Sequence, residues 1–284
     1  MDIRLEYTPR SPHHGVAFTE SQFARAGIDF TIGTSEAALA LVDLWDVGWP
    51  DGPVGESLGA ELSTERGLSH AARKRAIIEE VIAPTVDRCR AAGVQVFHCT
   101  HPTILEKYPQ WEPSTTEAER RPPGDGASPG EPRGECAGDE WPPSEWVEAW
   151  QDQHREAVWR MRDWGETQSR EVYPQIGIPT PVKPRDTDLL AFDANQFHRL
   201  LTERRIRVLF YMGFESTECL QHSACGMASM YGYGYQCVAV RDATTTYEAA
   251  ETLPGLWKSR VAILDIEARW GYSVTSSALL TAVG

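Results

Sequence analysis

The stretch that most constrains the fold of this chain is residues 205–224, RIRVLFYMGFESTECLQHSA. Its apolar run, Ile206 to Met212, predicts a buried strand, Gly213 marks a turn, and the small polar residues that follow open a helix. A strand that crosses into a helix in this way is typical of a parallel sheet, and open parallel sheets bind ligands at the carboxyl ends of their strands. Cys219 falls in the first turn of the predicted helix, where unpaired backbone N–H groups and the helix dipole favour a thiolate. Cys219 is therefore a candidate nucleophile.

A second region of the sequence predicts a strand–helix–strand unit. The apolar run that begins after Glu36 and ends at Asp43 predicts a buried central strand. Residues 69–92 have the spacing of an amphipathic helix, which Pro84 is expected to kink or split because proline lacks a backbone N–H. Residues 94–99 predict the next strand, so the three elements form a right-handed βαβ unit.

The same alternation returns in the second half of the chain, where periodicity predicts helices over 195–204 and 256–269 and a strand over 236–240. The fold class that follows is α/β, a doubly wound and mostly parallel sheet with helices on both faces. We expect residues 1–284 to form a single domain, with 1–34 as an N-terminal arm or edge hairpin and 104–175 as a long insertion.

The insertion has two parts. Residues 104–143 are dense in Pro, Gly, Glu and Arg and are too polar to form a core. A helix is predicted from Ser144, and its apolar face carries Trp146, Trp150, Ala157, Met161 and Trp164. These tryptophans either dock the helix onto the domain or a second subunit, or form an aromatic lid over a pocket.

Composition excludes several classes of partner. The formal net charge of −14 and the pI near 5.0 argue against a nucleic-acid partner and against an anionic membrane surface. No run of apolar residues is long enough for a transmembrane helix, and the N-terminus lacks the apolar core of a signal peptide. We therefore expect a cytoplasmic protein, in which the six scattered cysteines are not a disulfide framework.

Three residues are predicted at the carboxyl ends of strands or in the loops after them: Asp43, Lys183 and Cys219. Together an acid, a base and a thiol can hydrolyse an amide: the sulfur attacks the carbonyl carbon, Asp43 moves the proton, and Lys183 holds the carboxylate. Each residue also has a simpler interpretation: Asp43 as a helix cap, Lys183 as a solvated lysine and Cys219 as an inert core thiol.

The residues around these three positions resemble a family. AALALVDLWDVGW is similar to the first-strand motif of the isochorismatase-like cysteine hydrolases, with Asp43 at the catalytic aspartate position. VKPR resembles the lysine segment of that family, with Lys183 as the catalytic lysine. The segment from Gly213 to Cys219, followed by VAVRDAT, resembles the cysteine motif and the next strand. The resemblance covers about 35–100 and 178–250.

This resemblance implies a Rossmann-like fold, no cofactor, and assembly into a homodimer or homotetramer. It implies a cysteine-dependent amidohydrolase that cleaves a C–N bond of a small amide, urea-like or carbamoyl substrate through a thioester. It also implies a cis peptide at Phe214–Glu215 and an oxyanion hole made by the backbone amides of Glu215 and Cys219. Trp45 and Trp49, which closely follow Asp43, would wall the substrate pocket.

Two departures from the family pattern bear on the substrate. Glu215 stands where the family usually has a small or hydroxyl residue, so its carboxylate either accepts hydrogen bonds from a urea or amine group of the substrate or pairs with an arginine elsewhere. Residues 44–69 contain no histidine, so the metal site of nicotinamidase-like members is absent or altered, and we predict no metal. His98 and His101 alone are a poor ligand set, and His98 is expected to line the pocket or to be a satisfied structural histidine.

Two other functions remain. An isochorismatase-type hydrolase of another small metabolite is one, although the resemblance links that reaction to members without the cysteine. The second is a non-catalytic binding protein that uses the insertion as its partner surface. The chain has no GxSxG, and its YGYGY segment lies in the wrong context for a nucleotide-binding glycine motif.

Overall fold

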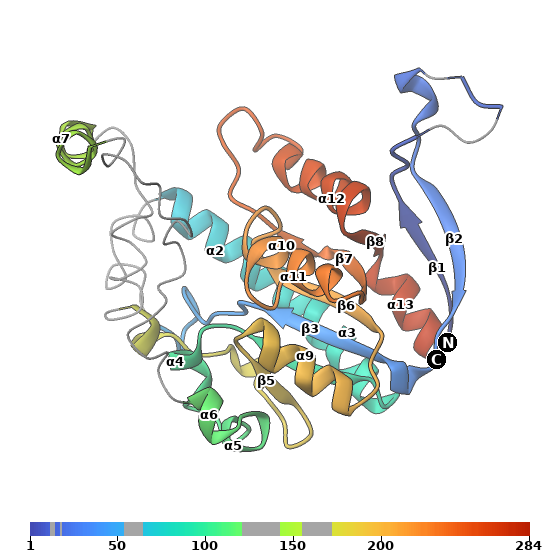
Figure 1. Ribbon diagram of the computed structural model, residues 1–284, viewed down its shortest axis with the longest axis horizontal. Helices are drawn as coiled ribbons and strands as arrows, with labels where there is room; N and C mark the ends of the chain where they lie inside the picture. The colour runs from blue at the N-terminus through green and yellow to red at the C-terminus, as the bar shows by residue number, and fades with distance from the viewer. Residues whose placement is uncertain (12–14, 18, 54–64, 121–142, 155–171) are drawn as a thin grey trace.

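The apolar runs of the sequence form a sheet in a computed structural model that describes residues 1–284 except 12–14, 18, 54–64, 121–142 and 155–171 (Figure 1). Within the described residues the sheet has eight strands in the order β2-β1-β8-β7-β6-β3-β4-β5. Their bounds are β1 Asp2–Tyr7, β2 Ala26–Thr31, β3 Ala37–Val42, β4 Gln95–Cys99, β5 Leu189–Ala191, β6 Val208–Phe214, β7 Gln236–Thr245 and β8 Gly271–Val274.

The sheet is parallel from β8 to β5, and only β1, which lies between the edge strand β2 and β8, runs antiparallel to its neighbours. The predicted arm therefore contains an edge hairpin, β1–β2, which joins the sheet through β8. The sheet confirms the predicted mostly parallel α/β fold. The central strand β3 is buried along its whole length, as its continuous apolar run predicts.

Helices cover both faces of the sheet (Figure 1). Successive side chains of β3 alternate between two apolar clusters, with Leu39 and Leu41 in one and Ala38 and Ala40 in the other. The first cluster includes residues of α2, α3 and α13, and the second includes residues of α9, α10, α11 and α12. The helix bounds are α2 Glu65–Ile77, α3 Ala83–Ala91, α4 Pro102–Leu105, α5 Trp111–Ser114, α6 Glu117–Arg120, α7 Ser144–His154, α9 Ala194–Glu203, α10 Cys219–His222, α11 Met227–Gly232, α12 Trp257–Arg269 and α13 Ser276–Val283.

Pro84 has the effect that its chemistry predicts. The helix expected over 69–92 consists of α2, a π-helical turn over Ile78–Ile82, and α3. Proline has no backbone N–H and its ring crowds the carbonyl one turn earlier, so the turn before it widens. Within the described residues no helix is both long enough and apolar enough to cross a membrane.

In the described part of the insertion, the tryptophans of α7 do not dock onto the domain, which is one of the two roles expected of them. Trp146 and Trp150 on α7 are 57% and 42% exposed, and their rings stack on each other with centroids 6.4 Å apart. Two rings with this exposure are not docked in a core, so packing onto the domain is wrong for these two. Ala157, Met161 and Trp164, expected on the same face, lie outside the described residues.

Candidate active site

The site begins with Asp43, which follows β3. Val42 pairs with Cys99 at the end of β4, so the next residues of the two strands, Asp43 and Thr100, lie side by side. The Thr100 hydroxyl donates to Asp43 Oδ1 at 2.5 Å and accepts a hydrogen bond from Trp45 Nε1 at 3.0 Å. Burial raises the pKa of Asp43 to about 6, against the opposing effect of the hydrogen bonds from Thr100 and Cys219.

Cys219 is the first residue of α10, and its thiol lies close enough to the Asp43 carboxylate for each group to shift the pKa of the other. The structure thus brings together two of the three predicted catalytic residues. Burial, and then the negative charge of Asp43, raise the pKa of the Cys219 thiol, so the sulfur keeps its proton at neutral pH. The expectation that the helix start favours a resting thiolate is wrong, because α10 has only four residues and burial beside carboxylates outweighs its dipole.

Lys183 does not join them. It is exposed at the end of the 3₁₀ turn Thr180–Val182. The pKa of Asp51 is lowered, first by a hydrogen bond from Thr180 and also by the charge of Lys183, whereas the largest influences on the pKa of Asp43 and of Cys219 come from other residues. Lys183 precedes the amino end of β5, while the site lies at the carboxyl ends of the strands. The sequence-based placement of Lys183 in the site is therefore wrong.

A different lysine occupies the site. Lys74 of α2 donates from Nζ to Glu215 Oε1 at 3.1 Å, and its ammonium lies 5.4 Å from the ring centroid of Phe214 and 6.0 Å from that of Trp45. Burial is the largest single effect and acts to lower the pKa of Lys74, but Glu215, Tyr247 and Asp43 together outweigh it and the pKa is raised, so the side chain is a cation. Its charge also lowers the pKa of Asp43, against the larger effect of burial.

Lys74 was missed because it stands in a run of basic residues, RKR, which usually marks a solvated helix face. A signal was nevertheless present. Lys74 precedes Ile78 by four residues and Val81 by seven, so it lies on the same helix face as the apolar residues. A charged side chain on the apolar face of an amphipathic helix must find a partner in the interior.

Glu215 is the partner of Lys74. The Phe214–Glu215 peptide is cis, at the position that the resemblance implies. Glu215 is 12% exposed, and its Oε1 atom lies 2.9 Å from His70 Nε2 as well as 3.1 Å from Lys74 Nζ. Burial acts to raise the pKa of Glu215, but Lys74 and His70 outweigh it and the pKa is lowered. Glu215 is thus an ionised carboxylate held by a lysine and a histidine, not by the arginine considered from the sequence.

Arg73 orients His70. Its Nη2 atom donates to His70 Nδ1 at 2.9 Å and to the carbonyl oxygen of Thr246 at 2.9 Å, while its Nε atom donates to Thr245 Oγ1 at 3.0 Å. Because Arg73 is a donor only, His70 must accept at Nδ1 and donate at Nε2 to Glu215. Glu215 Oε2 is buried and has no hydrogen-bond partner within the described part of the chain.

The loop before α10 is folded around one carbonyl group. The backbone amides of Glu218 and Leu220 donate to the carbonyl oxygen of Glu215 at 3.0 and 3.2 Å. The Cys219 amide lies between these two donors in the sequence, and across the described residues it makes no backbone hydrogen bond outside a helix or strand. It therefore suits the oxyanion-binding role that the resemblance implies for it.

Aromatic rings border the Asp43–Cys219 pair. Trp45 meets Tyr173 edge-on at 5.8 Å, and Tyr173 stacks on His101 at 4.1 Å. Burial, followed by the charges of Asp43 and Cys219, raises the pKa of Tyr173, which places its phenol beside the pair. Tyr173 lies in the segment assigned to the insertion, and no local pattern distinguished it.

Two predicted pocket residues lie elsewhere. Trp49 is 8% exposed in the apolar core, with the Arg75 guanidinium 5.1 Å from its ring centroid. His98 is 2% exposed, and its Nε2 atom is 3.0 Å from Asp188 Oδ2, which also binds Arg90. Its neighbours Phe97 and Cys99 point to the other face of the sheet, so His98 points to the face that α3 covers, where Asp188 satisfies it; it is the structural histidine and not a pocket residue. Within the described residues no three His, Cys, Asp or Glu side chains gather closely enough to hold a metal ion.

The isochorismatase domain model matches residues 64–260, which is more than half of the chain. A cysteine hydrolase from Pseudomonas syringae pv. phaseolicola has a similar structure at 14% identity, with a TM-score of 0.53 over 89% of this chain and 95% of that one. An isochorismatase from Pseudomonas putida (15% identity, 87% and 91% covered, TM-score 0.45) and a nicotinamidase from Staphylococcus aureus (12%, 85% and 99%, 0.37) are more distant.

No curated protein sequence matches this chain. At these identities the structural likeness supports the fold alone, and only the first of the three is close enough to do so. The family model supplies the assignment: this chain belongs to the isochorismatase family, and it has the α/β fold of that family's cysteine hydrolases.

Proposed function

We propose that this protein is a cysteine-dependent amidohydrolase that cleaves a C–N bond of a small amide, urea-like or carbamoyl compound through a thioester. The observation that carries this proposal is the closeness of the Cys219 thiol to the Asp43 carboxylate, whose pKa is raised to about 6 by burial. A carboxylate with this pKa is ionised at neutral pH and basic enough to take a proton in the transition state. A protonated thiol beside such a base is an activated nucleophile.

The first half of the reaction forms the thioester. As Cys219 Sγ bonds to the carbonyl carbon, its proton moves to Asp43, and the carbonyl oxygen becomes an oxyanion that the amides of Glu215 and Cys219 bind. When this intermediate collapses, the C–N bond breaks and Asp43 returns the proton to the leaving nitrogen.

The second half releases the product and restores the thiol. Water replaces the amine, Asp43 takes a proton from it as its oxygen attacks the thioester carbon, and the C–S bond breaks. The proton held by Asp43 returns to the sulfur. In this scheme Lys74 supplies the positive charge that the sequence assigned to Lys183, because its ammonium lies beside Glu215 and acts on Asp43.

The charges of the site favour a neutral or cationic substrate. Asp43 and Glu215 contribute two carboxylates against the single ammonium of Lys74. An acidic substrate would be repelled, whereas a substrate N–H group could donate to Glu215 Oε2, which is buried and has no partner among the described residues. We therefore propose a substrate that carries N–H donors next to its scissile carbonyl.

Glu215→Gln tests this substrate class. Removing the charge should raise KM for N–H-bearing ureas and amides about tenfold, because a hydrogen bond to a charged group is worth roughly 1.5–3 kcal/mol. The same variant should lose less on N-methylated analogues, which lack the donor. Equal losses on the two series would show that Glu215 supports Lys74 and does not touch the substrate.

The alternative within the family is hydrolysis of a C–O bond, as in isochorismate, which the matched domain description allows. Cys219→Ala separates the two reactions. Hydrolysis of an amide through a thioester needs the sulfur, and the variant should lose it entirely. A vinyl-ether substrate that the Ala variant still turns over would replace our proposal.

The direct test is a panel of small amides and ureas with ammonia detection, followed by mass spectrometry of the acid-quenched enzyme. We expect an acyl group on Cys219 and on none of the other cysteines. For wild type, kcat/KM should rise with pH through about 6, because Asp43 must be ionised to accept the thiol proton. The absence of turnover across the panel, or a rate that does not change between pH 5 and 7, would contradict the proposal.

A further inference from the structure

Helix α12 carries an exposed apolar ridge. Trp257, Val261 and Leu264 are 55%, 57% and 42% exposed, whereas Ile263 and Ile266 on the inner face are 5% and 0% exposed. The exposed three are spaced by four and three residues, so they follow each other along the outer face of the helix. An exposed apolar stripe on an otherwise amphipathic helix is the pattern of a helix that has a partner.

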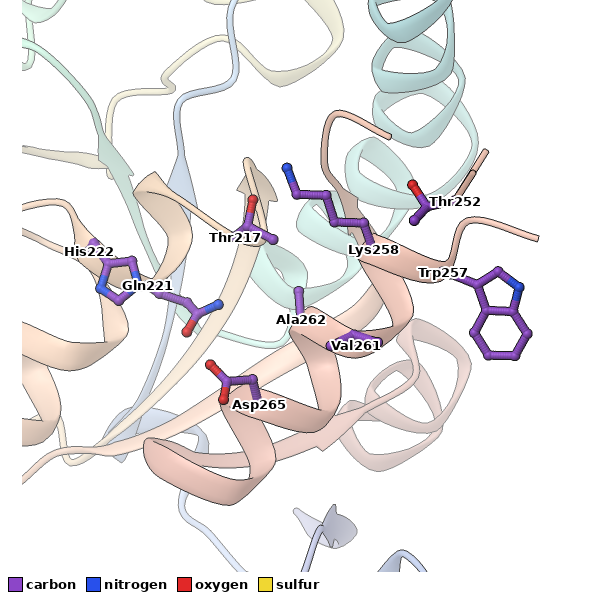
Figure 2. A pocket seen from close by; sticks show the side chains of 9 residues that line it. All are labelled: Thr217, Gln221, His222, Thr252, Trp257, Lys258, Val261, Ala262 and Asp265. Carbon is purple, nitrogen blue, oxygen red and sulfur yellow. The ribbon is translucent and has the colours of Figure 1, made fainter. Parts of the chain in front are cut away.

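The two flanks of this ridge differ. Counting from Val261, the helical repeat places Trp257 and Leu264 on one side and Lys258 and Asp265 on the other. Figure 2 shows the same division: Lys258 and Asp265 extend on the side that faces α10, while the ring of Trp257 points away from it. The groove between α10 and α12 has a volume of about 430 Å³.

We propose that α12 is the interface of a homodimer, in which it packs antiparallel against α12 of a second copy across a two-fold axis that passes Val261. A two-fold axis perpendicular to both helices, lying between them, reverses each helix and keeps its flanks on their own sides. The residue three or four positions before Val261 then faces the residue three or four positions after it in the other copy.

The sequence of α12 is self-complementary in that register. Lys258 of one copy faces Asp265 of the other, and this pair occurs twice. On the opposite flank Trp257 faces Leu264, also twice, and Val261 meets its own copy at the axis. A parallel two-fold arrangement would instead place the charged flank of each helix against the apolar flank of the other, so Lys258 and Asp265 would face no opposite charge.

Both charged groups are available for such pairs. Lys258 makes no ion pair within the described residues, and Asp265 is paired only with Arg269 of its own helix, at the surface. Opposite charges at this contact matter because each copy has a formal net charge of −14, which opposes association elsewhere on the surface.

The surroundings of α12 allow an interface of sufficient area. A helix of this length spans about 20 Å, and a stable interface buries about 800 Å² on each partner. Trp257 lies at the border of two clefts, the groove beside α10 and a second cleft of about 710 Å³ on the other side of α12. These concave flanks can receive the side chains that border the ridge of the second copy.

Sedimentation velocity over about 1–100 µM tests the interface. We expect wild type to be a dimer and Val261→Asp to dissociate at least about tenfold more readily, because it places two carboxylates at the axis. Ile28→Asp is the matched control, since Ile28 is another exposed apolar residue (43%), on edge strand β2. A monomeric wild type, or a dimer equally stable in Val261→Asp, would overturn the proposal.

Charge exchange tests the register. Lys258→Asp and Asp265→Lys should each weaken the dimer about tenfold, because each places like charges opposite one another twice. The double variant restores opposite charges in the two-fold register and should restore the affinity. Asp186→Lys, an exposed charge reversal away from α12, should leave it unchanged. A double variant as weak as the two single variants would exclude this geometry.

Discussion

At the scale of single residues, Asp43 is a carboxyl group that the fold keeps out of water. Burial raises its pKa to about 6, so the folded protein holds this proton more tightly than the unfolded chain does. Ionising Asp43 costs stability, and the cost grows as pH rises from about 4 to about 6 and is then constant.

Asp43→Asn should therefore make the protein more stable and inactive. Two pKa units correspond to about 2.7 kcal/mol, and after the loss of hydrogen bonds to the carboxylate we expect a gain of about 1–2 kcal/mol at pH 7. The gain should vanish near pH 4, where Asp43 is protonated in wild type. Urea denaturation at the two pH values measures it, and an Asn variant less stable than wild type at pH 7 would show that Asp43 is not strained by burial.

Substitutions of Lys74 and Lys183 by methionine form a matched pair of variants that tests which lysine acts in the site. Lys74→Met should lower kcat/KM about a hundredfold or more, because it removes the cation that faces Glu215 and Asp43. Lys183→Met should leave kcat/KM within about twofold, since Lys183 is exposed and acts on Asp51. Steady-state kinetics on the best substrate of the panel separates them. The reverse order would restore Lys183 to the site.

At the scale of elements, α12 depends on a side chain from outside the helix. Glu248 accepts hydrogen bonds from the backbone amides of Lys258 and Ser259 at 3.0 and 2.9 Å, and from Ser259 Oγ at 2.7 Å. It thereby satisfies donors that the first turn of a helix leaves free, and its charge lies at the positive end of the dipole. Burial acts to raise the pKa of Glu248, but Thr252 and the hydrogen bonds from Ser259 and Lys258 together outweigh it and the pKa is lowered.

Glu248→Ala should cost about 1–3 kcal/mol of unfolding free energy. Glu248→Gln should cost less, because one oxygen remains to accept. Since the folded-state pKa is lowered, the contribution is present above the unfolded pKa and is lost as pH falls through the folded value. The neighbouring Glu251→Ala, at an exposed position, is the control, and thermal melts at pH 7 and pH 3 would show the difference.

At the scale of the whole molecule, Asp188 joins segments that are far apart in the sequence. Its carboxylate accepts hydrogen bonds from Arg90 of α3 and from the backbone amide of Arg185 at 3.0 Å, and pairs with His98 of β4. Only 1% of the Asp188 side chain is exposed. Burial acts to raise the pKa of Asp188, but His98 and Arg90 outweigh it and the pKa is lowered.

Asp188→Asn should cost about 2–4 kcal/mol of unfolding free energy, since it leaves a buried guanidinium without its counter-charge. The exposed Asp186→Asn, two residues earlier, should change stability by less than about 0.5 kcal/mol. Guanidinium denaturation of the two variants tests the contrast. Similar midpoints would mean that Asp188 does not join these elements.

How far the sequence predicts this molecule depends on the range of the interaction. Strand β6 and the turn at Gly213 could be predicted because both depend on residues that are neighbours in the sequence. Gly213 has a φ of 123°, and a Cβ atom there would lie 2.0 Å from the carbonyl oxygen of Val42, so only glycine fits. The same local patterns placed Asp43 and Cys219 at strand ends, and parallel pairing brings such ends together.

The sequence by itself determined the α/β class, the strand ends and the position of the thiol, because hydrophobic period, turn chemistry and helix starts act over a few residues. Only the tertiary structure decided which lysine faces Glu215, because that depends on where α2 lies over the sheet. It also decided that the Cys219 thiol is protonated, because burial is a property of everything packed around a group and not of its neighbours in the chain.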